Sequence, residues 1–242
     1  MPDILVLDIE TSPHITYEWK LWGDHYTPAE RLIRPAEILC VSYKWVGERG
    51  VHTLRGARMA EQLKRIMTKA DAVVTYNGNR FDLKRIYALI VQSGLKPPAK
   101  PVSIDLFRVV ARNFDFPYKT LDYVCRTLLG AKKQKHPGMP MWIGCMEGDE
   151  VMWRKMIRYC EQDVRITEKL YLYLRPWISS QFSMTPIDEE KCPYCGSAEL
   201  VRQGTRRTKT RLYPRLLCKN CGGWSKGTHS IGSTTITEVN GA

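Results

Sequence analysis

Four carboxylates lie in three separate segments of the sequence, and together they could act on phosphate chemistry. Asp8 and Glu10 stand in LVLDIETSP, Asp82 in VVTYNGNRFDL and Asp163 in YCEQDVRIT. Four acids in one closed site would repel one another unless divalent cations bound between them. A pair of such cations can stabilise both the attacking and the leaving oxygen when a phosphodiester is cleaved. A two-metal site for phosphodiester cleavage is therefore the first hypothesis.

The first two acids are expected on a strand. DILVLDIE, residues 3–10, is rich in Ile, Leu and Val, which predicts a strand buried on both faces. Side chains alternate along a strand, so Asp8 and Glu10 should point to the same face. Taken alone, this pair is more typical of a strand whose polar end emerges into solvent.

The other two acids are expected on helices. A short strand, DAVVTYNG, precedes a helix at residues 80–94, and Asp82 falls in its first turn, where a carboxylate also complements the helix dipole. The pattern of the segment at residues 149–177 predicts a long helix, which should end before Pro176. Tyr159 and Asp163 are one turn apart and share a face of it. They could form a simple hydrogen-bonded pair, or a metal ligand and a group that orients water.

The three motifs together resemble a known family. D-x-E, N-x-x-x-F-D and Y-x-x-x-D are similar to the motifs of the DEDD 3′–5′ exonucleases, which have an RNase H-like fold. The tyrosine form is indicated, because the histidine form would place His at position 158, which is Arg158. DIETSP and YNGNRFDL resemble the exonuclease domain of family B DNA polymerases. YEWKLWGDHY, SYKWVGE and DLFRVVARNFDFPYKTLDYVCRTLLG resemble stand-alone, often phage-encoded, exonucleases, so the resemblance covers residues 3–175.

The resemblance implies a role for each matched residue. Asp8, Glu10 and Asp163 would hold a Mg²⁺ or Mn²⁺ ion that lowers the pKa of the attacking water. Asp8 and Asp82 would hold a second such ion at the leaving 3′ oxygen, and Tyr159 would orient the water. Contacts with the substrate are expected from Asn77, Thr11 and Phe81. Asp105 and Asp122 also fall in family-like segments, but we expect them to be structural or to support the metal ligands without touching the metal.

Charge is unevenly distributed along the 242 residues. The net charge is +12, and residues 191–242 hold nine Lys or Arg against two Glu, a net of +7. This excess predicts a polyanionic partner. A change in composition near residues 180–190 predicts two domains, at 1–180 and 188–242. No apolar run approaches a membrane span and no signal peptide is recognisable, so we expect a cytoplasmic protein, in a bacterial host if a phage encodes it.

Four cysteines in the C-terminal region have the spacing of a structural zinc site. Cys192 and Cys195 form one C-x₂-C pair, Cys218 and Cys221 form another, and 22 residues lie between the two pairs. Four thiolates in two such knuckles suit one tetrahedral Zn²⁺. About 50 residues bury too little core to be stable without such support. The alternative is two disulfides, which a chain without a secretory signal does not favour.

Two further segments are candidates for contacts with nucleic acid. Between the cysteine pairs, LVRQGTRRTKTRLYPRLLC predicts two strands and a basic turn, and phosphate contacts are expected from Arg206, Arg207 and Arg211. The alternative is a solvated hairpin. Residues 12–35 form a long insertion that begins just after Glu10, and Trp19 and Trp22 in it could stack on a single-stranded 3′ end or pack onto the domain.

The order of elements predicts an α/β RNase H-like domain with a mixed sheet, antiparallel neighbours first and parallel crossovers later, followed by a small zinc ribbon. The favoured function is a 3′–5′ exonuclease on DNA, with two Mg²⁺ or Mn²⁺ per site and one structural Zn²⁺. An exoribonuclease and a non-catalytic nucleic-acid-binding module are the alternatives. A polymerase or a single-strand-binding protein could be a partner in trans, and no membrane partner is expected.

Overall fold

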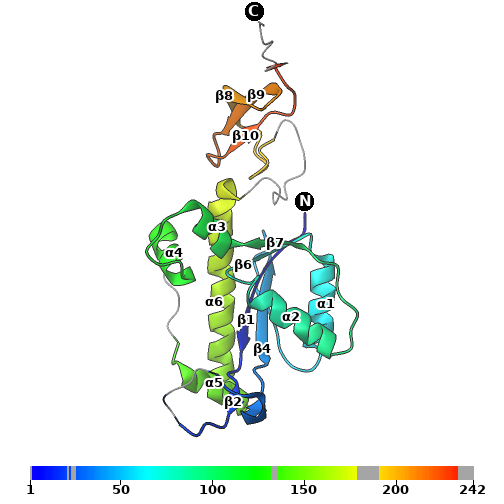
Figure 1. The fold of residues 1–242 in the computed structure, drawn as a ribbon, viewed down its shortest axis with the longest axis vertical. Coiled ribbons are helices and arrows are strands. Elements are labelled where there is room, and N and C mark those ends of the chain that lie inside the picture. The colour runs from blue at the N-terminus through cyan, green and yellow to red at the C-terminus, as the bar shows by residue number, and fades with distance from the viewer. Residues whose placement is uncertain (1, 21, 23–25, 132–135, 179–190, 234–242) are drawn as a thin grey trace, which may run out of the picture. The chain divides into compact units, whose positions relative to one another are not determined.

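Strand β1 (Ile4–Thr11) is the middle strand of a five-stranded sheet (Figure 1). It pairs antiparallel with β4 (Ile38–Trp45), which pairs antiparallel with β5 (His52–Leu54). On its other edge β1 runs parallel to β6 (Ala72–Thr75), which runs parallel to β7 (Val102–Asp105). The predicted mixed sheet is confirmed.

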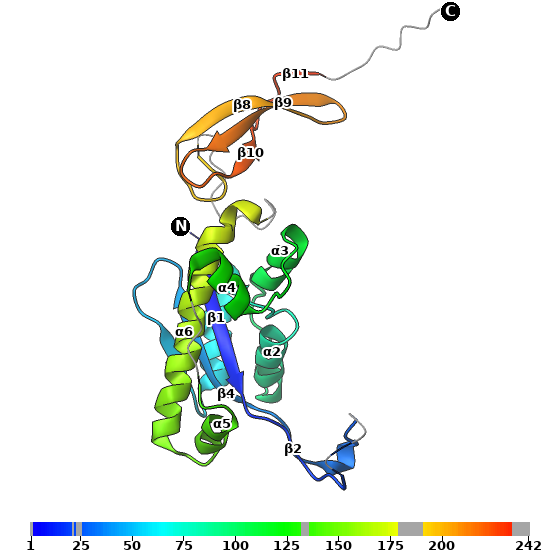
Figure 2. The same ribbon diagram turned by 90° about the vertical axis from the view of Figure 1, so that its left-hand side faces the viewer.

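Helices cover both faces of this sheet (Figure 2). Helices α1 (Met59–Lys69) and α2 (Asp82–Gln92) pack on one face, where Leu5 and Leu7 of β1 join Leu63 and Ile86 in one apolar cluster. Each fully buried Leu or Ile contributes about 1.5–3 kcal/mol relative to an exposed one. Because side chains alternate along β1, residues 8 and 10 must lie on the opposite face.

The opposite face is covered by α5 (Met139–Met146) and the long α6 (Glu150–Leu174). Cys40 of β4 packs there against Met156 and Cys160 of α6. A nearly buried ion pair also joins α6 to the sheet, with Lys44 Nζ 3.0 Å from Glu168 Oε2. Removing one partner of such a pair typically costs about 3–5 kcal/mol, so α6 is firmly fixed over β4.

The remaining elements before residue 179 are short. They are β2 (Ile15–Thr16), β3 (Leu32–Arg34), α3 (Leu106–Asn113), α4 (Leu121–Leu129) and 3₁₀ turns at Ala29–Arg31 and Arg175–Trp177. Strands β2 and β3 form a small ribbon within the insertion at residues 12–35. Helix α4 begins at the capping hydroxyl of Thr120 and ends at Gly130, whose φ of 63° suits a residue without Cβ.

The computed structural model describes residues 2–20, 22, 26–131, 136–178 and 191–233. Contacts divide the chain into residues 3–171 and a second unit made mainly of residues 172–242. The predicted boundary near residues 180–190 lies outside the described residues, so it stays a prediction. None of the helices in the described ranges is both long and apolar enough to cross a membrane.

The second unit contains a small antiparallel sheet. Strand β9 (Arg211–Cys218) pairs with β8 (Leu200–Arg207), β10 (Trp224–Lys226) and β11 (Gly232–Ser233). The two strands predicted between the cysteine pairs, joined by a short basic turn, are confirmed.

Candidate active site and metal centres

Three of the four predicted acids converge on the face of the sheet that α6 covers. Asp8 and Glu10 project from the C-terminal half of β1, and Asp163 projects from α6, where it is 2% exposed. One carboxylate oxygen from each lies within 4.8 Å of the other two. The alternation of β1 and the helical spacing of α6 together produce this cluster.

The cluster fits a divalent metal ion. Three carboxylates at this separation, one of them buried, repel one another in the anionic form. Mg²⁺ and Mn²⁺ prefer oxygen ligands and would offset this repulsion. Asp8, Glu10 and Asp163 are therefore suited to hold such an ion.

Asp82 is not a member of this three-acid group. It lies at the first position of α2 and is 6% exposed, and its carboxyl accepts backbone hydrogen bonds from its own N–H and from Ile9. Burial raises the pKa of Asp82 to about 6, and the nearby Asp105 adds to the rise. The hydrogen bond from Ile9 places Asp82 beside β1, next to the segment that carries Asp8 and Glu10.

The turn that positions Asp82 has an unusual backbone. Asn77 is the one non-glycine residue with a positive φ, 65°, among the described residues, as suits Asn in a tight turn. Gly78 follows, and a Cβ on it would lie 2.4 Å from Thr75 Oγ1. Only glycine fits there, because a Cβ would collide with Thr75. The tight turn connects β6 directly to α2.

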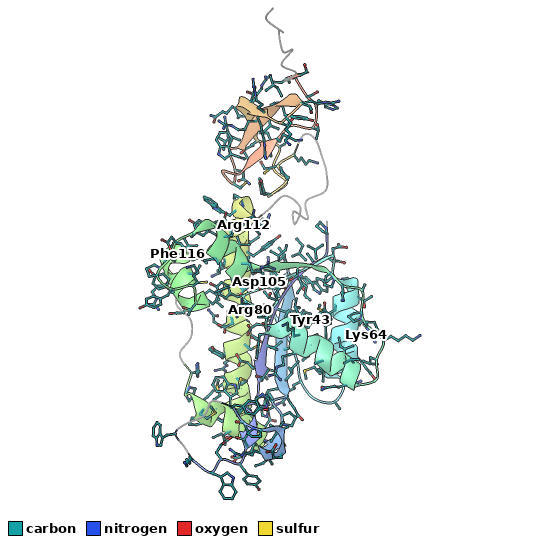
Figure 3. The ribbon with its side chains drawn as sticks, viewed as in Figure 1. Tyr43, Lys64, Arg80, Asp105, Arg112 and Phe116 are labelled. Atoms are coloured by element: carbon teal, nitrogen blue, oxygen red, sulfur yellow. The ribbon has the colours of Figure 1, made fainter. Side chains whose placement is uncertain are left out.

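Asp105 clamps the same turn. It lies at the end of β7, where α3 begins (Figure 3), and its Oδ1 accepts the N–H of Asn77 at 2.8 Å and of Phe107 at 3.1 Å. Its Oδ2 accepts the N–H of Asn79 at 3.2 Å. These hydrogen bonds agree with a structural role for Asp105. Asp122 forms an ion pair with Arg126 one turn away, and its role stays a prediction.

Tyr159 lies one turn before Asp163 and is 8% exposed. Its ring meets those of His136 and Trp142 edge-on, with centroids 4.9 and 6.4 Å away. His136 Nδ1 accepts the N–H of Gly138 at 3.1 Å, which leaves Nε2 as its N–H in the neutral form. No motif in the sequence indicates that His136 would lie against Tyr159.

Cys160 contacts the acid cluster directly. Its Sγ lies 3.5 Å from the backbone oxygen of Asp8 and 3.6 Å from Asp8 Oδ2. The hydrogen bond with Cys40, burial and the charge of Asp8 all raise the pKa of the Cys160 thiol. It therefore remains a protonated donor. No motif in the sequence links Cys160 to Asp8.

A family model described as the RNase H superfamily matches residues 48–175, more than half of the chain. The chain belongs to the RNase H superfamily. The matched range contains Asp82, Tyr159 and Asp163, and it begins after Asp8 and Glu10.

The RNase H-like fold is also found among solved structures. The chain is similar to the family B DNA polymerase of the hyperthermophilic archaeon Pyrobaculum calidifontis, with a TM-score of 0.52 and 17% sequence identity. The match covers 75% of this chain and 26% of the polymerase, so the chain spans about a quarter of that protein. At this identity the likeness concerns the fold alone. A search of curated proteins finds no match.

The predicted substrate contacts of the RNase H-like unit lie at its surface. Thr11 ends β1 beside Glu10, and Phe81 is 41% exposed at the start of α2, under the guanidinium of Arg85. Trp19 and Trp22 are 89% and 88% exposed. Their rings do not pack onto the domain, so of the two interpretations left open by the sequence, the structure favours a surface available for contact.

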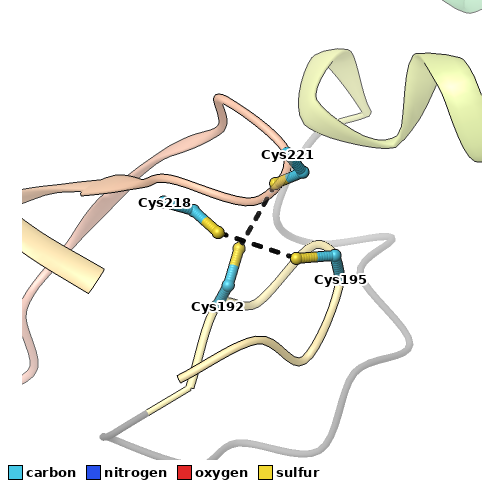
Figure 4. A group of neighbouring side chains, drawn as sticks. All are labelled: Cys192, Cys195, Cys218 and Cys221. Atoms are coloured by element: carbon cyan, nitrogen blue, oxygen red, sulfur yellow. Dashed lines mark hydrogen bonds between the residues drawn. The ribbon is translucent and has the colours of Figure 1, made fainter. Parts of the chain in front are cut away.

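The four predicted zinc ligands come together in the second unit (Figure 4). The Sγ atoms of Cys192 and Cys221 lie 3.7 Å apart, and so do those of Cys195 and Cys218. Four sulfurs at about 2.3 Å from a tetrahedral zinc ion would be roughly 3.8 Å apart, whereas a disulfide needs about 2.05 Å. The geometry fits a metal and not two disulfides.

Local donors also prepare this cluster for a metal. Burial would raise the pKa of the Cys195 thiol, but hydrogen bonds from the backbone of Ser197 and from Asn220 outweigh it and lower the pKa to about 7. Burial instead raises the pKa of the Cys192 and Cys221 thiols, so Cys195 is the ligand that these donors favour as a thiolate. Thiolate is the form that binds metal. Arg206, Arg207 and Arg211 lie exposed on the strands nearby.

Proposed function

We propose that the protein is a metal-dependent 3′–5′ exonuclease that shortens DNA and releases nucleoside monophosphates. The observation that carries the proposal is the cluster of Asp8, Glu10 and Asp163, with carboxylate oxygens within 4.8 Å of one another. Membership of the RNase H superfamily supports metal-dependent hydrolysis of nucleic acid. The order of the motifs supports the tyrosine form of the DEDD exonucleases. DNA is the substrate to test first, because the solved structure with a similar fold is a DNA polymerase.

The acids divide into two ligand sets in this proposal. Asp8, Glu10 and Asp163 hold one Mg²⁺ or Mn²⁺, and Asp8 and Asp82 hold a second. When bound, such ions lower the pKa of water and offset negative charge on a leaving oxygen. Asp82 suits a shared role because the N–H of Ile9 fixes its carboxyl beside β1. Its raised pKa leaves it partly neutral near pH 6 until a cation favours the carboxylate.

Two uncharged side chains of α6 position other groups for the reaction. Tyr159 presents its hydroxyl one turn from Asp163 and orients the attacking water, and its packing against His136 and Trp142 limits the motion of the ring. Cys160 donates its S–H towards Asp8 Oδ2 and so fixes which way that carboxylate faces. At the surface, Asn77, Thr11 and Phe81 contact the terminal nucleotides.

The C-terminal cysteines hold one Zn²⁺ per chain, which stabilises the ribbon fold. Metal analysis of the purified protein should therefore find one zinc per chain, and Cys218→Ser should lower it. A zinc-free ribbon with two disulfides would overturn this part of the proposal.

End-labelled substrates test the reaction. With Mg²⁺ or Mn²⁺, 5′-labelled single-stranded DNA should give a ladder that shortens from the 3′ end, and 3′-labelled DNA should release labelled mononucleotide at once. Asp8→Asn should lose nearly all activity. Asp122→Asn is the matched control, since this acid pairs with Arg126 and is not a member of the cluster.

Each other outcome changes the assignment. Full activity in Asp8→Asn, or without a divalent metal, would refute the metal-dependent site. Degradation of labelled RNA but not of DNA would make the protein an exoribonuclease. Binding without cleavage of any substrate would leave a nucleic-acid-binding module on a nuclease fold.

A further inference from the structure

One face of the C-terminal sheet gathers cations and aromatic rings. In an antiparallel pair, residues directly opposite each other share a face, as do alternate residues along a strand. Arg206 is opposite Tyr213, and Lys226 is opposite Arg215. The shared face, here called the Tyr213 face, therefore carries Arg206, Arg211, Tyr213, Arg215, Trp224 and Lys226.

A β-bulge decides which arginines of β8 belong to this face. The register shifts between Arg202 and Thr205, and Gly204 there has a φ of 76°. The extra residue reverses the alternation beyond it. As a result Arg206 joins the Tyr213 face, whereas Arg207, opposite Leu212, and Arg202, opposite Leu216, lie on the other face.

Two of the four cations of the Tyr213 face are held in place by its rings. The guanidinium of Arg215 lies 4.6 Å from the centroid of the Trp224 ring, and Lys226 Nζ lies 3.9 Å from that of Tyr213. Arg215 Nε also donates to the backbone oxygen of Gln203 at 3.1 Å. Long basic side chains that are already ordered lose less conformational entropy when they bind a ligand.

The charge and the planar groups of this face indicate its ligand. It presents four cations, and β8, β9, β10 and β11 contain no Asp or Glu. Trp224 is 43% exposed and stacks with a guanidinium, so a planar layer remains open at the surface. Fixed cations bind phosphates, and aromatic or guanidinium planes stack on unpaired bases.

We infer that the Tyr213 face is a binding surface for single-stranded nucleic acid. Arg206, Arg211 and Lys226 contact the phosphates, and the Arg215–Trp224 layer stacks on bases. The inference deepens the proposed function and rests on it for the class of ligand. It assigns the recognition of the strand to one face and not to the whole basic hairpin.

A pair of matched double variants tests the assignment to one face. Binding of a fluorescein-labelled 20-nucleotide oligothymidylate to the full-length protein is measured by anisotropy without added Mg²⁺ or Mn²⁺. The test is therefore independent of cleavage. Arg206→Gln/Arg211→Gln removes two charges from the Tyr213 face, and Arg202→Gln/Arg207→Gln removes two from the other face. Zinc content checks that each ribbon is folded.

The salt dependence of the Kd should separate the two double variants most clearly. Each phosphate contact with a single strand contributes about 0.7 to the slope of log K against log [salt], so the first double variant should lower the slope by about 1.4. Its Kd at moderate salt should rise roughly tenfold or more. The second should leave the slope unchanged and the Kd nearly so. Equal losses in both variants would overturn the inference, because charge alone would then explain binding.

Trp224 tests the stacking independently of charge. Trp224→Ala should weaken oligothymidylate binding roughly tenfold with an unchanged salt slope, and Trp224→Phe should restore most of it. Unchanged affinity in both the alanine variant and the Arg206→Gln/Arg211→Gln variant would refute the inference, and the face would then serve another partner, such as an acidic protein.

Discussion

Replacing Asp105 tests how the turn between β6 and α2 is held. This acid is 4% exposed and accepts three backbone N–H groups, from Asn77, Asn79 and Phe107, at 2.8–3.2 Å. In Asp105→Ala these donors lose a charged acceptor. Each such loss costs about 1–3 kcal/mol, and because the three share one carboxylate we expect about 3–5 kcal/mol in total.

The size of this loss can be measured by thermal unfolding. For a chain of this length, about 1 kcal/mol shifts Tm by roughly 2–4 °C, so Asp105→Ala should lower Tm by roughly 10 °C. Asp105→Asn keeps an acceptor at Oδ1 but turns an NH₂ group towards the N–H of Asn79, and it should lose about half as much. Asp122→Asn, which removes the charge of a partly exposed acid, should change stability by less than about 0.5 kcal/mol.

A metal-binding measurement shows whether Asp105 holds the turn or is itself a metal ligand. The structural role predicts that Asp105→Asn, assayed below its own Tm, still binds Mn²⁺ at the cluster of Asp8, Glu10 and Asp163. A variant with unchanged Tm that had lost Mn²⁺ binding would refute the reasoning, since Asp105 would then be a ligand and not a clamp.

Three further variants have expected outcomes. Burial raises the pKa of Asp82 from 3.8 to about 6, so the folded state binds the proton more tightly than the unfolded state does. In the metal-free protein the free energy of unfolding should therefore fall by up to about 3 kcal/mol as pH rises from 4 to 7. Urea unfolding should show that Asp82→Asn removes this fall, and an equal fall in the variant would contradict the assignment. Trp19→Ala/Trp22→Ala should leave stability within about 0.5 kcal/mol, because both rings are almost fully exposed. It should weaken binding of single-stranded DNA roughly tenfold, and unchanged affinity would exclude a stacking role. Tyr159→Phe keeps the ring that packs on His136 but removes the hydroxyl, so kcat should fall roughly 10²–10³-fold with Mn²⁺ affinity unchanged. Loss of Mn²⁺ binding in a folded Tyr159→Phe protein would show that the role is wrong.

The parts of the site that depend on local periodicity could be predicted from the sequence. Alternation along β1 placed Asp8 and Glu10 on one face, and the helical pattern of α6 placed Tyr159 and Asp163 one turn apart. The cysteine spacing predicted the four-thiol cluster. In each case the relation is set by the geometry of one element or one knuckle.

The parts that depend on packing between distant segments could not be predicted. The contact of Cys160 with Asp8 joins residues 152 positions apart, and it requires α6 to lie across β1. His136 reaches Tyr159 in the same way. On the ribbon, regular alternation along β8 would have placed Arg206 and Arg207 on the wrong faces, because the bulge near Gly204 reverses the pattern. The sequence pattern does not reveal that bulge.

Mn²⁺ binding tests the central claim most directly. Free Mn²⁺ is counted by its EPR signal while the ion is titrated into the full-length protein, with wild type, Asp8→Asn and Asp122→Asn compared. The cluster of Asp8, Glu10 and Asp163 predicts saturable uptake by wild type and Asp122→Asn, and loss of most of that uptake in Asp8→Asn. Equal uptake by all three proteins, or none by wild type, would contradict a metal site at this cluster.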